Sequence, residues 1–206
     1  SCYIMENLNY RKIFFEFVSI SFAVFLGMMM NQWRDSYNNK QLAKQSLNNI
    51  LIEVSDNREL VSRLLAGHKR IVSEIDSALF LVENGAEDDA AEIEGNVEFS
   101  IVQSTAWETS KLTQAIAYMD MDLVAEIAGT YNYQEYYQSL VMTYVRDNIL
   151  NSGMTKFLSG DGVEDLDELK RFKVFLSDIT VLEEKLIRNY DDVLEAAGMS
   201  SVSDME

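Results

Sequence analysis

Apolar residues follow two patterns along this chain, one continuous and one periodic. The continuous pattern covers residues 13–30, IFFEFVSISFAVFLGMMM, where Glu16 is the only charged residue. A helix of this length rises about 27 Å, close to the thickness of the hydrocarbon core of a bilayer. A cleaved secretory signal would end in a small-residue cleavage site, whereas this run ends in MMMNQWRD. We therefore predict a transmembrane helix at residues 13–30 rather than a signal or a buried core helix.

Small residues share one face of this predicted helix. Ser19, Ala23 and Gly27 recur every four residues, and a helical wheel places Glu16 within about 20° of Ala23 and Gly27. A groove of small side chains lets another helix approach closely, and a carboxylate there favours a polar contact with that helix. Alternatively, Glu16 lies at headgroup level and pairs with Lys12 one turn earlier. We predict that Glu16, Ser19, Ala23 and Gly27 form a face for a partner helix.

Basic and aromatic residues flank the apolar run. Arg11 and Lys12 precede it, while Trp33 and Arg34 follow it, and such residues commonly lie at the membrane interface. Residues 1–12 are then a short N-terminal tail. The basic pair favours a cytoplasmic N-terminus and a translocated C-terminal domain. Arg34 and further basic residues on the far side count against this orientation.

The periodic pattern begins after residue 30 and has helical spacing. No Gly lies between residues 31 and 66, and the chain has no Pro, so one helix is predicted from the membrane to about Val82. Its apolar stripe is wide, which suits a helical bundle better than a two-stranded coiled coil. One row of this stripe, with residues seven apart, is Leu47, Val54, Val61, His68, Ile75 and Val82. The stripe is interrupted at Asn57 and Arg58, and we interpret His68 as a core residue, with a pH-sensitive or ligand-binding role as the alternative.

Residues 83–104 interrupt the helical pattern. Residues 83–96 carry six carboxylates and two glycines without the spacing of a calcium-binding loop, so a solvated loop is expected. Residues 97–102 alternate like a strand but are too short and solitary to form a sheet.

Further helices are predicted downstream. Thr105 and Glu108 have the spacing of a capping box, which places a helix at 105–118. Asp120 or Asp122 caps another at about 123–158, where the hydroxyls of Tyr133, Tyr136 and Tyr137 are expected to reach water. After a turn at 159–162 a last helix ends near Gly198. The predicted fold class is all-α: a membrane helix, an acidic helical bundle over residues 31–198, and a disordered tail at 199–206.

Composition narrows the function. The net charge of −17 argues against nucleic acid as a partner. The chain has one His and one Cys, and it lacks a Gly-rich phosphate loop and a Gly-x-Ser-x-Gly motif. Nucleophilic triads, zinc sites and nucleotide-binding loops therefore lack their parts. We expect no enzymatic activity, no catalytic residues, no cofactor and no metal.

Two segments also carry a resemblance. Residues 11–35, RKIFFEFVSISFAVFLGMMMNQWRD, combine a basic pair, an apolar helix with an early Glu and an Asn-x-Trp-Arg exit. Residues 104–137, STAWETSKLTQAIAYMDMDLVAEIAGTYNYQEYY, contain a Thr-Ala-Trp-Glu-Thr block. In these features the chain resembles an uncharacterised family of bacterial single-pass membrane proteins, departing from it at Leu112 and Gln114, near where the block usually has a small residue. The resemblance implies a membrane anchor in the bacterial envelope and implies no activity.

Two functions of different classes remain. The first is an accessory or scaffold subunit of a bacterial membrane protein complex, with the lipid bilayer and other membrane subunits as partners and a homo-oligomer left open. The alternative is an envelope sensory or ligand-binding bundle. A sensor needs a route for its signal across the membrane, and about twelve residues precede the anchor, which favours the subunit. The expected location is the inner membrane, with the N-terminus cytoplasmic and the acidic domain periplasmic.

Overall fold

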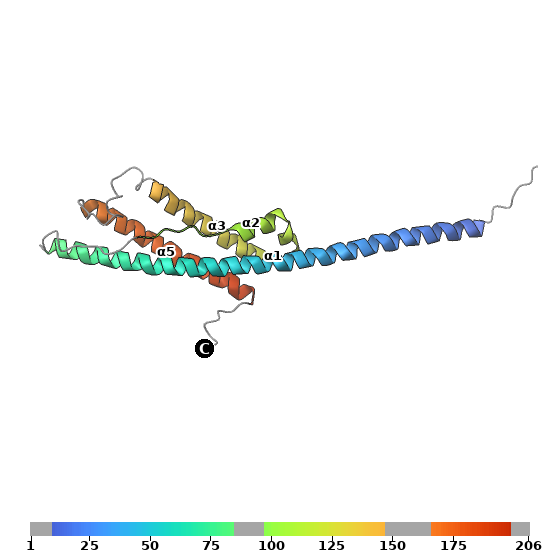
Figure 1. Cartoon of the computed structure of the whole chain (residues 1–206), viewed down its shortest axis with the longest axis horizontal. Coiled ribbons are helices and arrows are strands. Elements are labelled where there is room, and N and C mark those ends of the chain that lie inside the picture. Colours follow the sequence, from blue (N-terminus) through green and yellow to red (C-terminus); the bar gives the residue numbers. More distant parts are fainter. Residues whose placement is uncertain (1–9, 85–96, 147–165, 199–206) are drawn as a thin grey trace, which may run out of the picture.

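The computed structural model describes residues 10–84, 97–146 and 166–198, and in these ranges the chain is helical or irregular, with no strand. The predicted all-α class is confirmed. Figure 1 shows one very long helix, with the other helices gathered along the half that is far from its N-terminus. The elements are α1 (Tyr10–Glu83), α2 (Thr105–Leu112), the 3₁₀ helix η2 (Ala115–Tyr118), α3 (Met121–Tyr144) and α5 (Leu166–Ala196).

Helix α1 has two halves with different surroundings. Every described side chain from Lys12 to Asn38 is exposed, and the first buried side chain is that of Ala43. Beyond Ala43, the predicted apolar stripe faces the other helices. Helix α1 runs unbroken to Glu83, which confirms the prediction of one helix through about Val82. The most buried stripe residues are Ile50, Val54, Val61, Leu64, His68, Ile71 and Ile75. The helix begins at Tyr10, so the last three residues of the expected tail are helical.

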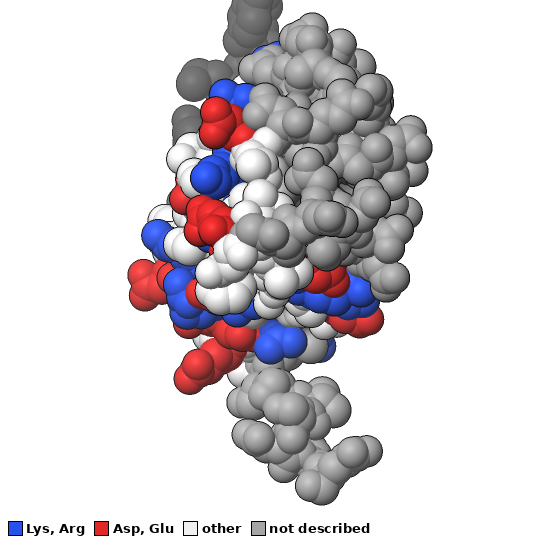
Figure 2. Space-filling view, turned by 90° about the vertical axis from the view of Figure 1, so that its left-hand side faces the viewer, with Lys and Arg blue, Asp and Glu red and all other residues white. Residues whose placement is uncertain are grey.

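Helix α5 runs antiparallel to α1 and makes the largest contact with it. Ion pairs between α1 and α5 show that the two helices are antiparallel, because the residue numbers of the α1 partners rise as those of the α5 partners fall. Their partners are partly exposed, so each pair adds little stability and mainly marks the register. The pairs are Arg58–Asp191, Lys69–Glu184, Asp76–Lys173 and Glu83–Lys170. Figure 2, viewed from the end opposite the N-terminus of α1, shows basic and acidic side chains interspersed on the described surface.

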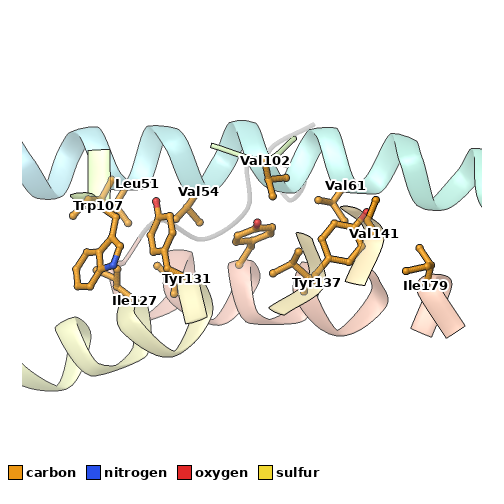
Figure 3. Packing of buried hydrophobic residues seen from close by; sticks show 14 residues of the cluster. Leu51, Val54, Val61, Val102, Trp107, Ile127, Tyr131, Tyr137, Val141 and Ile179 are labelled. Carbon is orange, nitrogen blue, oxygen red and sulfur yellow. The ribbon is translucent and has the colours of Figure 1, made fainter. Parts of the chain in front are cut away.

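The main core lies between α1, α3 and α5 (Figure 3). Val102, from the extended residues before α2, lies among these helices, and Tyr131 and Tyr137 rise from α3 toward α1 (Figure 3). A second cluster lies between α1 and α5, farther from the N-terminus of α1, and includes Ile71 and Phe172. Burial of these aromatic and branched side chains is the main source of the stability of the body.

The start of α2 differs from the prediction. Its N-cap is Ser104, whose side chain makes no capping bond, so the capping box predicted from Thr105 and Glu108 is wrong. Glu53 of α1 supplies the cap instead, because its Oε2 accepts a hydrogen bond of 2.8 Å from the backbone N–H of Ala106. The carboxylate of Glu53, which is distant in the sequence, thus caps the N-terminus of α2 in place of the local side chains.

The end of α2 and the flanks of α3 also refine the prediction. Helix α2 ends at Leu112, and Gln114 takes a left-handed φ of 58° before η2 begins. Glycine adopts this conformation most readily, and here glutamine takes it. Asp120 caps α3 as predicted, through bonds to the N–H groups of Asp122 and Leu123. Residues 147–158, expected to continue that helix, lie outside the described residues, as does the expected tail at 199–206.

Candidate functional site

The N-terminal part of α1 has the properties of a membrane span. Among the described helices, α1 is the one that is long and apolar enough to cross a membrane. No residue of its most apolar stretch is buried. Large apolar side chains cover it, and Phe14, Phe17, Ile20 and Met30 are all more than 60% exposed. A soluble body cannot leave such an area in water without aggregating, so this segment needs lipid or another protein around it.

The structure leaves the predicted helix-packing face open. Glu16, Ser19, Ala23 and Gly27 are all exposed on the projecting half of α1, where no other described element covers them (Figure 1). Apart from the adjacent residues and the backbone of the same helix, no atom lies within 4 Å of a Cβ added at Gly27. The alternative role of Glu16, pairing with Lys12, is not seen among the described ion pairs, which leaves the carboxylate available to a partner helix.

A polar collar follows the apolar run on the same helix. Asn31 donates a hydrogen bond of 3.1 Å to Asp35 and accepts one of 3.3 Å from Arg34. Trp33 projects beside them with 76% of its surface exposed, and Tyr37 follows one turn later. This order of side chains suits a membrane interface. On the other side of the span, Arg11 belongs to the first turn of α1 and Lys12 is exposed.

Buried polar groups link the elements of the folded body in addition to its apolar core. Residues 97–104 form an extended segment, which we call the strap, and side chains from α1 and α3 bind its backbone. Asn57 binds Gln103 twice, accepting from its N–H at 2.9 Å and donating to its carbonyl oxygen at 2.7 Å. Gln134 donates to the same carbonyl at 2.8 Å, and Gln138 donates to the carbonyl of Val102 at 2.6 Å. These amides replace the sheet partners that an isolated extended segment lacks.

Glu53 is a second buried polar group. Besides capping α2, it accepts a hydrogen bond of 2.6 Å from the hydroxyl of Tyr131. Burial, and then the hydrogen bond and charge of Glu53, raise the pKa of the Tyr131 phenol, which therefore stays protonated as a donor. Trp107 stacks on Tyr131 with ring centroids 5.6 Å apart. This cluster joins α1, α2 and α3.

His68 and Glu183 form the third and deepest polar group. Their exposed fractions are 1% and 0%, and Nδ1 of His68 lies 2.9 and 3.1 Å from the two carboxylate oxygens. The hydroxyl of Tyr137 donates to the same carboxylate at 2.8 Å. Burial, and then the neighbouring charge of Glu183, raise the pKa of the Tyr137 phenol. The prediction that the three tyrosine hydroxyls reach water is therefore wrong for Tyr137, which is buried. Tyr136 is exposed, and Tyr133 is half-buried at the edge of the core.

These residues could have been suspected from their spacing. Asn57 and His68 occupy positions of the α1 stripe, at three- and four-residue steps from Val54, Val61 and Leu64. Glu183 likewise falls four residues after Ile179 and three before Leu186 on the apolar face of α5. The signal is a polar residue in a core position of a helix, and Asn57 in the α1 stripe is such a residue.

Comparison with protein-family models, with curated proteins and with solved structures gives no match to this chain. In the described residues no group of three or more His, Cys, Asp and Glu side chains could hold a metal ion. The expectations of no catalytic residues, no cofactor and no metal stay predictions. The geometry thus offers an open apolar helix and a rigidly tied helical body.

Proposed function

We propose that this chain is a non-enzymatic accessory or scaffold subunit of a bacterial membrane protein complex. The observation that carries the proposal is the apolar, wholly exposed segment of α1, which continues without a break into the core of the body. An unbroken helix has no hinge, so the body is oriented by whatever holds the anchor. A lipid-facing helix with one small-residue face, bearing Ser19, Ala23 and Gly27, is suited to packing against other membrane helices.

The dimensions of α1 support a scaffold that stands above the membrane. Residues 31–42 separate the apolar run from the first buried residue, Ala43, and they rise about 18 Å as a helix. The headgroup layer occupies only about 5–8 Å of that distance. The acidic body would therefore lie beyond the lipid surface, at the height of the extramembrane parts of neighbouring subunits.

We further propose that the chain lies in the bacterial inner membrane with its N-terminus in the cytoplasm and its acidic body in the periplasm. Arg11 and Lys12 support this orientation through the positive-inside rule. The resemblance of residues 11–35 and 104–137 to a bacterial single-pass family supports the compartment.

Gly27→Leu is expected to release the partner subunits. A leucine on the small-residue face holds the backbones apart, and lipid provides little hydrophobic force to compensate. No other element of the chain and no side chain beyond the adjacent residues lies within 4 Å of the added Cβ, so the body should stay folded. The measurement is quantitative mass spectrometry of proteins that co-purify with the full chain from native membranes in a mild detergent.

The matched control is Ser21→Leu, which adds the same side chain about 160° from the centre of the small-residue face. Retention of partners by Gly27→Leu at the level of this control would limit the anchor to a tether. Glu16→Gln in the same assay is expected to weaken association by about 1 kcal/mol if the carboxylate contacts the partner helix.

Thiol labelling is expected to place the body outside the cytoplasm. Ser139 is exposed on α3, and in a Cys2→Ser background Ser139→Cys carries the only thiol. It should react with an impermeant maleimide on intact spheroplasts. Reaction only after lysis would reverse the proposed orientation while leaving the anchor in place.

A cavity supports a second candidate function, a sensory or ligand-binding bundle. It has a volume of about 310 Å³, and Trp107, Lys111, Tyr131, Gln134 and Gln138 are among its lining residues. That is the lower end of the size of small-molecule sites. Co-purification of the chain without partner proteins would favour this candidate.

A further inference from the structure

His68 lies between two hydrogen-bond acceptors. On one side Nδ1 faces the carboxylate of Glu183 at 2.9 and 3.1 Å, and on the other Nε2 lies 3.0 Å from the carbonyl oxygen of Glu98 in the strap. A backbone carbonyl can only accept, and a neutral imidazole has one donor and one acceptor nitrogen. With Glu183 ionised, both contacts are satisfied only when each ring nitrogen carries a proton.

We propose that His68 and Glu183 form a proton-binding site that locks the strap into the helical body. The bound proton makes His68 a double donor, which ties Glu183 of α5 to the backbone of Glu98 through α1. Three separate elements thus depend on one proton.

Loss of this proton leaves a conflict whichever tautomer remains. If Nδ1 keeps its hydrogen, the lone pair of Nε2 faces the Glu98 carbonyl. If Nε2 keeps its hydrogen, the lone pair of Nδ1 faces the carboxylate. In either case the negative charge of Glu183, with no exposed surface, has lost its compensating positive charge. Release of the Glu98 carbonyl and opening of the strap relieve this conflict.

The groups around His68 and Glu183 separate this pair from the neighbouring charges. Tyr137 of α3 is the further titratable group in contact, and its hydroxyl donates to Glu183. The ring of Phe99, from the strap, covers His68 with centroids 5.3 Å apart. The next residue along each helix, Lys69 and Glu184, forms a separate pair that is largely exposed. Lys69 therefore neutralises Glu184 at the surface and leaves Glu183 to His68.

The sign of the pH dependence follows from proton counting. A proton that the folded body binds and the unfolded chain does not is taken up on folding, so the stabilisation that it gives is lost as the pH rises. The equilibrium constant for unfolding should rise about tenfold per pH unit while the folded state keeps its proton.

Nitrogen NMR on the full chain in detergent micelles tests the protonation directly. The chain has one histidine, so ¹⁵N-histidine labelling yields the signals of a single ring. At pH 7.5 both nitrogens are expected to have imidazolium shifts, and the Gln103 amide bound to Asn57 should exchange slowly with solvent. A neutral ring at pH 7.5 in the folded chain would overturn the proposal, whatever the variants do.

Glu183→Gln tests the dependence on the carboxylate, with Glu184→Gln as the control one residue along α5. In urea unfolding between pH 6 and 9, wild type and the control should show the tenfold change per pH unit, and Glu183→Gln should lose it. Equal pH dependence in Glu183→Gln and wild type would contradict the proposal. If Glu183→Gln does not fold, the ring signals of wild type decide the question.

Discussion

His68→Leu is expected to lower the free energy of unfolding of the helical body by about 3–5 kcal/mol, the usual effect of removing one partner of a buried ion pair. Leucine fills most of the volume of the imidazole, so lost packing is a minor part. The larger part is the carboxylate of Glu183, left with no exposed surface and, among the described residues, with the Tyr137 hydroxyl as its one remaining donor. The measurement is urea unfolding of the full chain in detergent at pH 6, followed by circular dichroism.

The control for this variant is Lys69→Leu, which removes a neighbouring partner whose side chain is 55% exposed. Exposed pairs contribute about 0–1 kcal/mol, so this change should be small. A similar loss of unfolding free energy in both variants would mean that burial does not make the His68–Glu183 pair more important for stability than an exposed pair.

A triple variant separates the cost of burying charge from the cost of losing packing. With His68→Leu, Glu183→Met and Tyr137→Phe together, no charge or hydroxyl is left without a partner. Apolar replacement of a whole buried ion pair is often neutral or stabilising. The remaining loss, about 1–2 kcal/mol, comes from the Glu98 carbonyl, which no longer has a donor. A triple variant less stable than His68→Leu alone would contradict this account.

The fold was largely predictable because the helical signals are local and agree with one another. The absence of Pro and the three- and four-residue steps from Ile50 to Ile75 are read from neighbouring residues alone. The start of α2 was misplaced by one residue because its cap, Glu53, lies on another helix. No local pattern can reveal a cap supplied across more than fifty residues.

The buried polar pairs were not predictable because they depend on how α5 docks on α1. Apolar residues recur along both helices, so a shift of α5 by seven residues would still bring apolar faces together. That shift would place Glu183 against an apolar position of α1 and leave His68 without a carboxylate. The pairing of His68 with Glu183 therefore excludes alternative registers, a role for which buried polar groups are well attested.

The properties of the apolar segment of α1 were predictable from the sequence. The expectation of a span at 13–30 follows from length and composition, and the small-residue face follows from helical periodicity. The structure adds that, apart from the adjacent residues and the backbone of the same helix, no atom lies within 4 Å of a Cβ added at Gly27.

Asn57→Asp is expected to destabilise the body by about 3 kcal/mol at neutral pH, although the two side chains have nearly the same shape. Asn57 is 2% exposed, and its Nδ2 donates to the Gln103 carbonyl at 2.7 Å and to Gln134 Oε1 at 3.3 Å. The substitution replaces this donor by a carboxylate oxygen that faces the two acceptors. Since no atom is removed, the expected loss comes from electrostatics and not from a cavity.

The pH dependence of this variant identifies the cause. Burial raises the pKa of the introduced carboxyl above its ordinary value of about 3.9, so the penalty is present at neutral pH and declines as the pH falls. Once protonated, the carboxyl donates to the Gln103 carbonyl as the amide did. The control, Asn48→Asp, lies on the same helix at an exposed position and should change stability by less than about 0.5 kcal/mol. Urea unfolding of both variants at pH 4.5 and pH 7 is the measurement, and an Asn57→Asp penalty that does not shrink in acid would show that the strap is not held by the donor of Asn57.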